Sequence, residues 1–307
     1  MQLCDINTVR ELMEKYGLTL KKSYGQNFLI NPEVPRRIAE SSRSFADCDK
    51  PAGVIEIGPG VGALTQYLCQ EYDKVLAIEL DRGLIPLLHE ALGEYDNYKV
   101  LEADFMKTDL ASLIDEHFRD ITDNGGTVSI CANLPYYITS PVIMKIFESF
   151  EPDRKIPLSS VVVMIQLEVA QRIVSRPGSN EYGAITASIG LYADSKKLFD
   201  VSPGNFLPPP KVRSAVVSMI PHGGIKEIYP DFTGEKNEIA EFSESVRETI
   251  ALAFGQRRKT LINSMSSKYS KEKTLKVLEQ CGIRGDIRGE KLSSYDFCKI
   301  THMLKYI

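Results

Sequence analysis

The chain has 307 residues, 43% of them hydrophobic, which is enough to bury one large core or two modest ones. No apolar run approaches the ~20 residues of a membrane-spanning helix, and the N-terminus lacks a signal-peptide pattern. The net charge of −4 alone argues weakly against a nucleic-acid partner. However, residues 241–307 hold 13 Lys and Arg against 8 Asp and Glu, an excess of five positive charges that leaves −9 on the rest. A basic tail on an acidic body fits a polyanionic ligand at one face, or simply a solvated helical surface.

In chain order, the first predicted element is a short amphipathic helix that stops at Gly17. Strand patterns then alternate with helix patterns. The predicted strands are 54–57, 74–79, 98–102, 127–131 and 160–166, and the predicted helices are 61–69, 84–92, 141–150 and 167–174. This alternation is typical of an α/β fold with a mostly parallel, doubly wound sheet.

Two further strand patterns, 186–192 and 212–220, have no helix pattern between them and predict an antiparallel pair at one edge of the sheet. Residues 221–238 are rich in Gly, Pro and charge, and the pattern beyond them is helical to the end. We therefore expect a sheet-containing domain over 1–222, a linker over 223–240 and a small all-α domain over 241–307. No heptad seam suggests more than a monomer.

The six cysteines and four histidines show neither CxxC nor HxxxH spacing. We expect free thiols in a reducing cytoplasm, no zinc site and no association with a membrane.

A glycine-rich turn, EIGPGVGA at 56–63, joins the first strand to the first helix of the sheet. Gly58 and Gly60 allow a tight turn and a close approach of a ligand. The string also fits the dinucleotide-binding pattern, and a plain strand–helix turn is the simplest alternative. Glu79 ends the second strand, where a carboxylate can accept both hydroxyls of an adenosine ribose, and Asp104 follows the third strand, where it can accept from an adenine amino group.

The most informative stretch is Asn133-Leu134-Pro135-Tyr136, which follows the fourth strand. The Asn133 side chain offers a carbonyl acceptor, and Leu134 is pushed into an extended conformation by the following proline, so its backbone carbonyl can point outward. Tyr136 adds a flat aromatic face. Two acceptors beside a ring suit an exocyclic amino group on a planar base. A dehydrogenase would need a proton-transfer residue, and no histidine lies near a strand end.

Several strings occur in order along the chain. They are YGQNFL, EIGPGVGALT, IELD, ADF, NLPYYITS, QLEVAQRI, FLPPPKVRSAVV and FGQRRKTLINS, starting at Tyr24. Together they resemble the small-subunit ribosomal RNA adenine dimethyltransferases, the kasugamycin-resistance family, over nearly the whole chain. The resemblance implies a Rossmann-like class I methyltransferase domain and a helical RNA-binding domain. It also implies S-adenosylmethionine-dependent dimethylation of two adjacent adenosines in the 3′-end hairpin of 16S rRNA, within the small ribosomal subunit or its precursor.

By the same resemblance, Asn27 and Leu29 would contact the cofactor, and the two glycines would lie beside its methionine part. Asn133 would lie between cofactor and substrate. Tyr136 and Phe206 would sandwich the extruded target base.

Structural alternatives remain for some of these positions. Phe206 could be a core residue, and Asn27-Phe28-Leu29 could form a helix cap and staple. Residues 256–259, QRRK, could contact phosphate or be a solvated helix face. The other basic residues that could face RNA are Lys21, Lys22, Arg36, Arg37, Lys211 and Arg213.

Two functional alternatives remain open at this point. A 23S rRNA adenine methyltransferase of the macrolide-resistance type would share the fold and the Asn-x-Pro-aromatic corner. A non-catalytic ribosome-assembly factor could keep the fold without the chemistry.

Overall fold

The computed structural model describes residues 1–18, 27–149, 157–256 and 258–306, and its chain divides into two compact units. The described part of unit 1 comprises 1–18, 27–149, 157–170 and 196–220, and that of unit 2 comprises 171–195, 221–256 and 258–306. Residues 171–195 therefore group with the C-terminal residues, whereas the sequence indicated a single division at 223–240. Lys21, Lys22 and the first residues of the YGQNFL string lie outside the described residues.

Unit 1 is built on a seven-stranded sheet with the order β4-β3-β2-β5-β6-β9-β7. The strands are β2 Ala52–Ile57, β3 Lys74–Glu79, β4 Tyr98–Glu102, β5 Thr127–Asn133, β6 Leu158–Gln166, β7 Ala193–Val201 and β9 Ser214–Pro221. The neighbours from β4 to β6 pair in parallel, and β6 pairs antiparallel with β9. The mostly parallel sheet with an antiparallel edge is the fold class that the sequence predicted.

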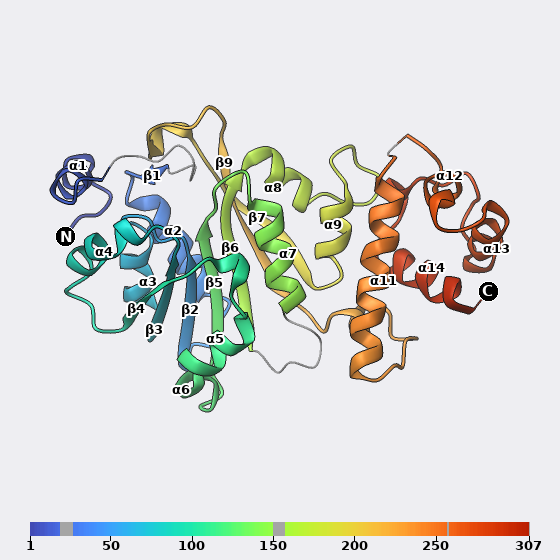
Figure 1. The fold of residues 1–307 in the computed structure, drawn as a ribbon, viewed down its shortest axis with the longest axis horizontal. Helices are drawn as coiled ribbons and strands as arrows, with labels where there is room; N and C mark the ends of the chain where they lie inside the picture. The colour runs from blue at the N-terminus through green and yellow to red at the C-terminus, as the bar shows by residue number, and fades with distance from the viewer. Residues whose placement is uncertain (19–26, 150–156, 257, 307) are drawn as a thin grey trace. The chain divides into compact units, whose positions relative to one another are not determined.

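Helices cover both faces of this sheet, as Figure 1 shows. They are α2 Glu33–Arg43, α3 Thr65–Glu71, α4 Ile85–Ala91, α5 Leu110–His117, α6 Arg119–Thr122, α7 Thr139–Ser149 and α8 Leu167–Ile173. Helix α2 packs on α3, β5 and β6, and α5 packs on α7. The strand order reverses direction between β2 and β5, and open α/β sheets bind ligands outside the carboxyl ends of their strands at such a point.

The predicted strand at 186–192 is wrong, because residues 184–189 form helix α9 (Ala184–Ile189). Four of its six residues are buried, from Thr186 to Ile189, so no amphipathic period marks it as a helix. The Thr186 hydroxyl donates to the Arg172 carbonyl oxygen at 2.6 Å and accepts from the Gly183 N–H at 3.4 Å, which stabilises the start of the helix. The outermost strand of the edge is instead β7.

A separate two-stranded ribbon joins two segments that are far apart in sequence. Strand β1 (Phe28–Leu29) pairs antiparallel with β8 (Phe206–Leu207), so that Leu29 lies opposite Phe206. The Asn31 amide donates to the Asn205 side-chain oxygen at 2.8 Å and extends the connection. Before the ribbon, helix α1 (Ile6–Lys15) is capped by Asp5 and followed by Gly17 at φ 60°, as predicted.

Unit 2 is helical in its described C-terminal part. It contains α9, α10 Ile225–Ile228, α11 Lys236–Phe254, α12 Leu261–Ser264, α13 Lys271–Cys281 and α14 Ser294–Tyr306. Helix α11 packs against α9 and α14, and α13 packs against α14. The segment expected to be a linker thus holds α10 and the start of α11. Among the described helices of the chain, none is long and apolar enough to cross a membrane.

Candidate active site

One cavity of unit 1 is lined by every residue that the sequence singled out for catalysis or cofactor binding. These are Asn27, Leu29, Gly58, Gly60, Glu79, Asp104, Asn133, Leu134, Tyr136 and Phe206. They come from the ends of β2, β3, β4 and β5 and from the β1–β8 ribbon. The sheet topology therefore brings together residues that are up to 179 positions apart in the chain.

The backbone of the glycine-rich turn after β2 has a conformation that allows a ligand to approach it closely. Gly58 and Gly60 have φ values of 71° and 61°, in the left-handed region that favours glycine. A Cβ on Gly58 would meet no atom within 4 Å, whereas a Cβ on Gly60 would lie 3.2 Å from the Phe28 ring. The Gly58 N–H donates to the Ile78 carbonyl oxygen at 2.9 Å, which holds the turn against β3.

Glu79 is tied to this turn by hydrogen bonds. One carboxylate oxygen accepts from the Gly60 N–H at 3.3 Å and the other accepts from the Asp81 N–H at 2.7 Å. Burial raises the pKa of Glu79, while the hydrogen bonds from Asp81 and Gly60 lower it. A fixed, partly desolvated carboxylate can accept strongly from ligand hydroxyl groups.

Asp104 follows the end of β4, and its carboxylate already has contacts within the chain. Its Oδ1 accepts from the Met106 N–H at 3.0 Å, which caps the short turn Phe105–Lys107, and its Oδ2 lies 3.6 Å from the Lys107 ammonium. A carboxylate has about four acceptor positions, so the cap leaves room for a hydrogen bond from a ligand.

The corner after β5 presents two acceptors, as the sequence suggested. The Asn133 Nδ2 donates to the Asn27 carbonyl oxygen at 3.2 Å, which sets the amide orientation. Within the described residues, neither the Asn133 Oδ1 nor the Leu134 carbonyl oxygen accepts a hydrogen bond. The Leu134 N–H donates to the Met164 carbonyl oxygen at 3.1 Å and fixes the corner on β6.

Two aromatic residues of the cavity are fixed from different directions. Tyr136 is half-buried, and its hydroxyl lies 3.0 Å from the Ser214 hydroxyl on β9. Phe206 is 2% exposed and belongs to the main hydrophobic cluster of unit 1. It therefore is a core residue and also lines the cavity, so the alternative reading of Phe206 as a core residue holds without excluding a role in the site.

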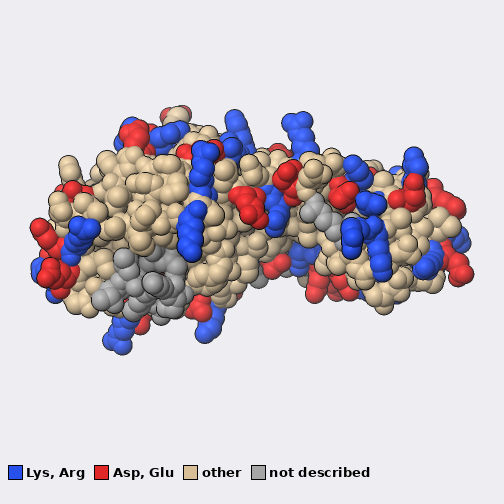
Figure 2. All heavy atoms as spheres, turned by 90° about the horizontal axis from the view of Figure 1, so that it is seen from above, with Lys and Arg blue, Asp and Glu red and all other residues tan. Residues whose placement is uncertain are grey.

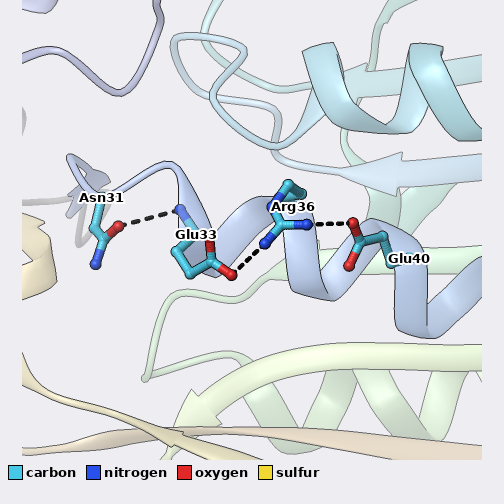
Figure 3. Close-up of polar contacts among 4 residues, drawn as sticks. All are labelled: Asn31, Glu33, Arg36 and Glu40. Carbon is cyan, nitrogen blue, oxygen red and sulfur yellow. Dashed lines mark hydrogen bonds and ion pairs between the residues drawn. The ribbon is translucent and has the colours of Figure 1, made fainter.

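The other structural alternatives are settled by contacts. Asn31, not Asn27, accepts from the Glu33 N–H at 3.1 Å at the start of α2 (Figure 3). Gln256, Arg258 and Lys259 do not lie on a helix face, because α11 ends at Phe254 and the Lys259 N–H donates to the Gln256 carbonyl oxygen at 2.9 Å in a turn. Arg257 of this string lies outside the described residues.

The basic residues expected to face RNA differ in whether they form ion pairs with neighbouring acids. Arg36 pairs with Glu33 and Glu40 on α2 (Figure 3), and Arg213 pairs with Asp200 at 3.1 Å. Arg37 forms no ion pair with any described residue, and its guanidinium carbon lies over the Phe199 ring, 3.8 Å from the ring centroid. On the face drawn in Figure 2, Lys and Arg side chains are interspersed with Asp and Glu.

Lys211 contrasts with the paired arginines. It is exposed and forms no ion pair within the described chain, and it follows the prolines that lead away from β8. Arg258 and Lys259 are likewise exposed and unpaired among the described residues.

Glu56 is the site residue that sequence reasoning missed. It lines the cavity, is 1% exposed, and its Oε2 has no hydrogen-bond partner among the described residues. Burial raises its pKa from 4.5 to about 8, with a further increase from Glu79 and a decrease from the nearby Thr65 hydroxyl. The signal was available, because a charged residue inside a strand with the pattern VIEI is unusual unless a partner is supplied.

The comparisons with known proteins identify the family of the chain. A family model described as ribosomal RNA adenine dimethylase matches residues 17–306. The chain belongs to the ribosomal RNA adenine dimethylase family. This family membership confirms the resemblance seen in the sequence strings, together with the expected fold class and the enzyme class.

Relatives in this dimethylase family match over almost the full length. The chain is 37% identical over 303 residues to the ribosomal RNA small subunit methyltransferase A of Geobacillus sp. (strain WCH70), covering 97% of this chain and 96% of the relative. A dimethyladenosine transferase from Plasmodium falciparum has a similar structure, with a TM-score of 0.66, 25% identity and coverage of 89% of this chain and 95% of that one. The 23S rRNA methyltransferase ErmE, with a TM-score of 0.61, 22% identity and coverage of 91% and 100%, shares the fold.

Proposed function

We propose that this cavity transfers methyl groups from S-adenosylmethionine to the exocyclic amines of two adjacent adenosines in the 3′-end hairpin of 16S rRNA. The observation that carries the proposal is the convergence of a glycine cradle, two strand-end acids and two free acceptors in one cavity. Family membership and relatives named for the small ribosomal subunit support the 16S substrate over 23S rRNA.

The residues present fit the cofactor. The open space beside Gly58 would admit its methionine part, and Asn27 and Leu29 would flank it from the ribbon. Glu79 would accept from the ribose hydroxyls and Asp104 from the adenine amino group. The unpartnered Oε2 of Glu56 would accept from the amino group of the methionine part, directly or through water. When bound, the cofactor supplies an electrophilic methyl group.

The substrate side of the mechanism belongs to the Asn133 corner. The Asn133 Oδ1 and the Leu134 carbonyl oxygen would accept the two N–H groups of the target amine and orient its lone pair toward the methyl donor. Tyr136 and Phe206 would hold the two faces of the extruded base. The thioether of the cofactor would be a neutral, good leaving group, and the methylated cationic amine would release its proton to water, so the chain needs to position the amine and has no need of a strong base.

Methylation assays test the proposal directly. Purified small subunits from a strain lacking the enzyme should gain dimethyladenosine with the wild-type protein, as read by mass spectrometry of the rRNA, whereas naked 23S rRNA should not. Asn133→Ala should lower the rate by about 10- to 100-fold, the worth of one lost hydrogen bond to a developing charge. Asn124→Ala, an exposed position outside the cavity, is the matched control.

Normal methylation by the Asn133 variant would overturn the assigned role of this residue. A wild-type protein that binds the small subunit but does not bind S-adenosylmethionine in calorimetry would instead favour a non-catalytic assembly factor. We further propose that the protein acts in the cytoplasm as a monomer, coupled to small-subunit biogenesis. Light scattering during size exclusion, alone and with the subunit, checks the oligomeric state.

A further inference from the structure

The mouth of the cavity carries exposed apolar side chains that the proposed chemistry does not use. Leu80, Met106 and Tyr137 all line the cavity, yet they are 53%, 39% and 61% exposed. Large apolar side chains grouped at the rim of a site indicate a surface that a partner covers.

Tyr137 is the residue of this rim best suited to a nucleobase. It directly follows Tyr136, whose hydroxyl is held at the Ser214 hydroxyl, but Tyr137 is far more exposed and has no hydrogen bond or ring contact within the described residues. Consecutive residues of this turn thus place one ring half-buried in the site and one at its entrance. A free aromatic face at the entrance is the usual platform for an unstacked RNA base.

The elements around Tyr137 are held in place. Helix α7 begins at Thr139, and its Lys145 ammonium donates to the Met106 carbonyl oxygen at 2.8 Å. The Thr139 hydroxyl donates to the Pro135 carbonyl oxygen at 3.3 Å and closes the turn that presents Tyr137. A platform on a fixed turn loses little entropy when a base stacks on it.

We propose that Tyr137 stacks the nucleobase adjacent to the adenosine being methylated. This inference rests on the proposed function. With one adenosine in the cavity, its neighbour lies on Tyr137, so that the enzyme recognises two purines together and not a single flipped base. The residue sets substrate specificity and is not part of the methyl-transfer chemistry.

The test is a cycle that combines one change in the full-length protein with one change in the rRNA. Small subunits are prepared with the natural rRNA and with the adjacent adenosine replaced by uridine, which stacks less well. Tyr137→Ala should raise KM for the natural subunit by about 5- to 100-fold, the range for one lost base–aromatic stack, with kcat and S-adenosylmethionine affinity unchanged. On the uridine subunit the same variant should lose much less, because the stack is already weakened.

Two further variants keep the test specific. Tyr137→Phe should behave as wild type, since the Tyr137 hydroxyl has no partner in the described chain. Phe45→Ala removes another exposed aromatic ring of unit 1, outside the cavity, and should change neither KM nor kcat. Equal KM losses for Tyr137→Ala on both subunits, an unchanged KM, or weaker cofactor binding would each overturn the inference. A wild-type enzyme inactive on natural subunits would instead overturn the proposed function.

Discussion

The buried carboxyl of Glu56 should make the protein less stable as the pH rises toward 8. Its side chain is 1% exposed and its Oε2 has no partner in the described residues, so burial favours the protonated form and raises the pKa from 4.5 to about 8. In the unfolded chain the same group ionises near 4.5. Between these pH values the folded state binds a proton that the unfolded state releases, so the free energy of unfolding falls with rising pH.

The magnitude follows from the linkage relation. One proton of difference corresponds to about 1.4 kcal/mol per pH unit, so from pH 5.5 to 7.5 Glu56 alone should remove about 2–3 kcal/mol of stability. The neutral, similarly shaped Glu56→Gln variant cannot release a proton and should lack this part of the pH dependence. The contribution of Glu79, whose pKa is also raised, remains in both proteins and cancels in the comparison.

Urea unfolding of the cofactor-free proteins at pH 5.5 and 7.5 measures the effect. The wild-type free energy of unfolding should fall by about 2–3 kcal/mol more than that of the variant over this interval. Glu90→Gln, which changes an exposed carboxylate paired with Lys15 and not lining the cavity, is the control. Equal pH slopes for the wild type and Glu56→Gln would refute the reasoning that Glu56 is protonated when the site is empty of cations.

Three other outcomes are expected. The affinity of the wild type for S-adenosylmethionine, measured by calorimetry, should rise from pH 5.5 to 7.5, because a cationic amino group favours ionised Glu56. The affinity of Glu56→Gln should be lower and should not change with pH. A wild-type affinity that is independent of pH would count against a contact between Glu56 and the amino group. Gly58→Ala should destabilise the protein by about 1–2 kcal/mol through its φ of 71° and should also weaken cofactor binding by filling the open space; normal affinity would contradict the cradle. Replacing Arg258 and Lys259 by Ala should weaken binding to the small subunit and flatten its salt dependence, whereas an unchanged slope would exclude phosphate contact.

Strand positions were the most predictable part of the fold. The predicted strand 98–102 has the same bounds as β4, and 74–79 the same bounds as β3. Short β-branched and aliphatic runs bounded by turn residues are strong local signals, and the sheet's parallel order follows from their alternation with helices.

The secondary-structure predictions were wrong where the conformation depends on contacts with residues far away in the sequence. Helix α9 has four buried residues out of six, so its sequence AITASI carries no alternating polar face and was read as a strand. For the QRRK string only the alternative of a helix face is wrong, because α11 ends at Phe254, and nothing local marks that end except the following glycine. In both places the surrounding unit decides the conformation.

The residues that line the candidate site were predictable because several of them are unusual residue types at strand ends. Asparagine before Leu-Pro-Tyr, and acids after buried strands, are poorly explained by packing alone. Glu56 was not predicted as a site residue because it lies inside a strand and in a motif whose glycines were taken as its functional residues. The exposed Tyr137 escaped because exposure cannot be read from a Tyr-Tyr pair in the sequence.

The two buried acids of the cavity, Glu56 and Glu79, should make it bind the methyl-donating form of the cofactor more tightly than the demethylated form. Glu56 and Glu79 line the same cavity, and burial raises the pKa of both carboxyl groups. No described Lys or Arg pairs with either. Such an arrangement costs stability unless a ligand supplies positive charge. S-adenosylmethionine carries a sulfonium charge that its demethylated by-product lacks, so the same two carboxyl groups should hold the donor more tightly than the product. Two successive methylations of one adenosine require this exchange each time, and Glu56 on β2 and Glu79 on β3 should favour it.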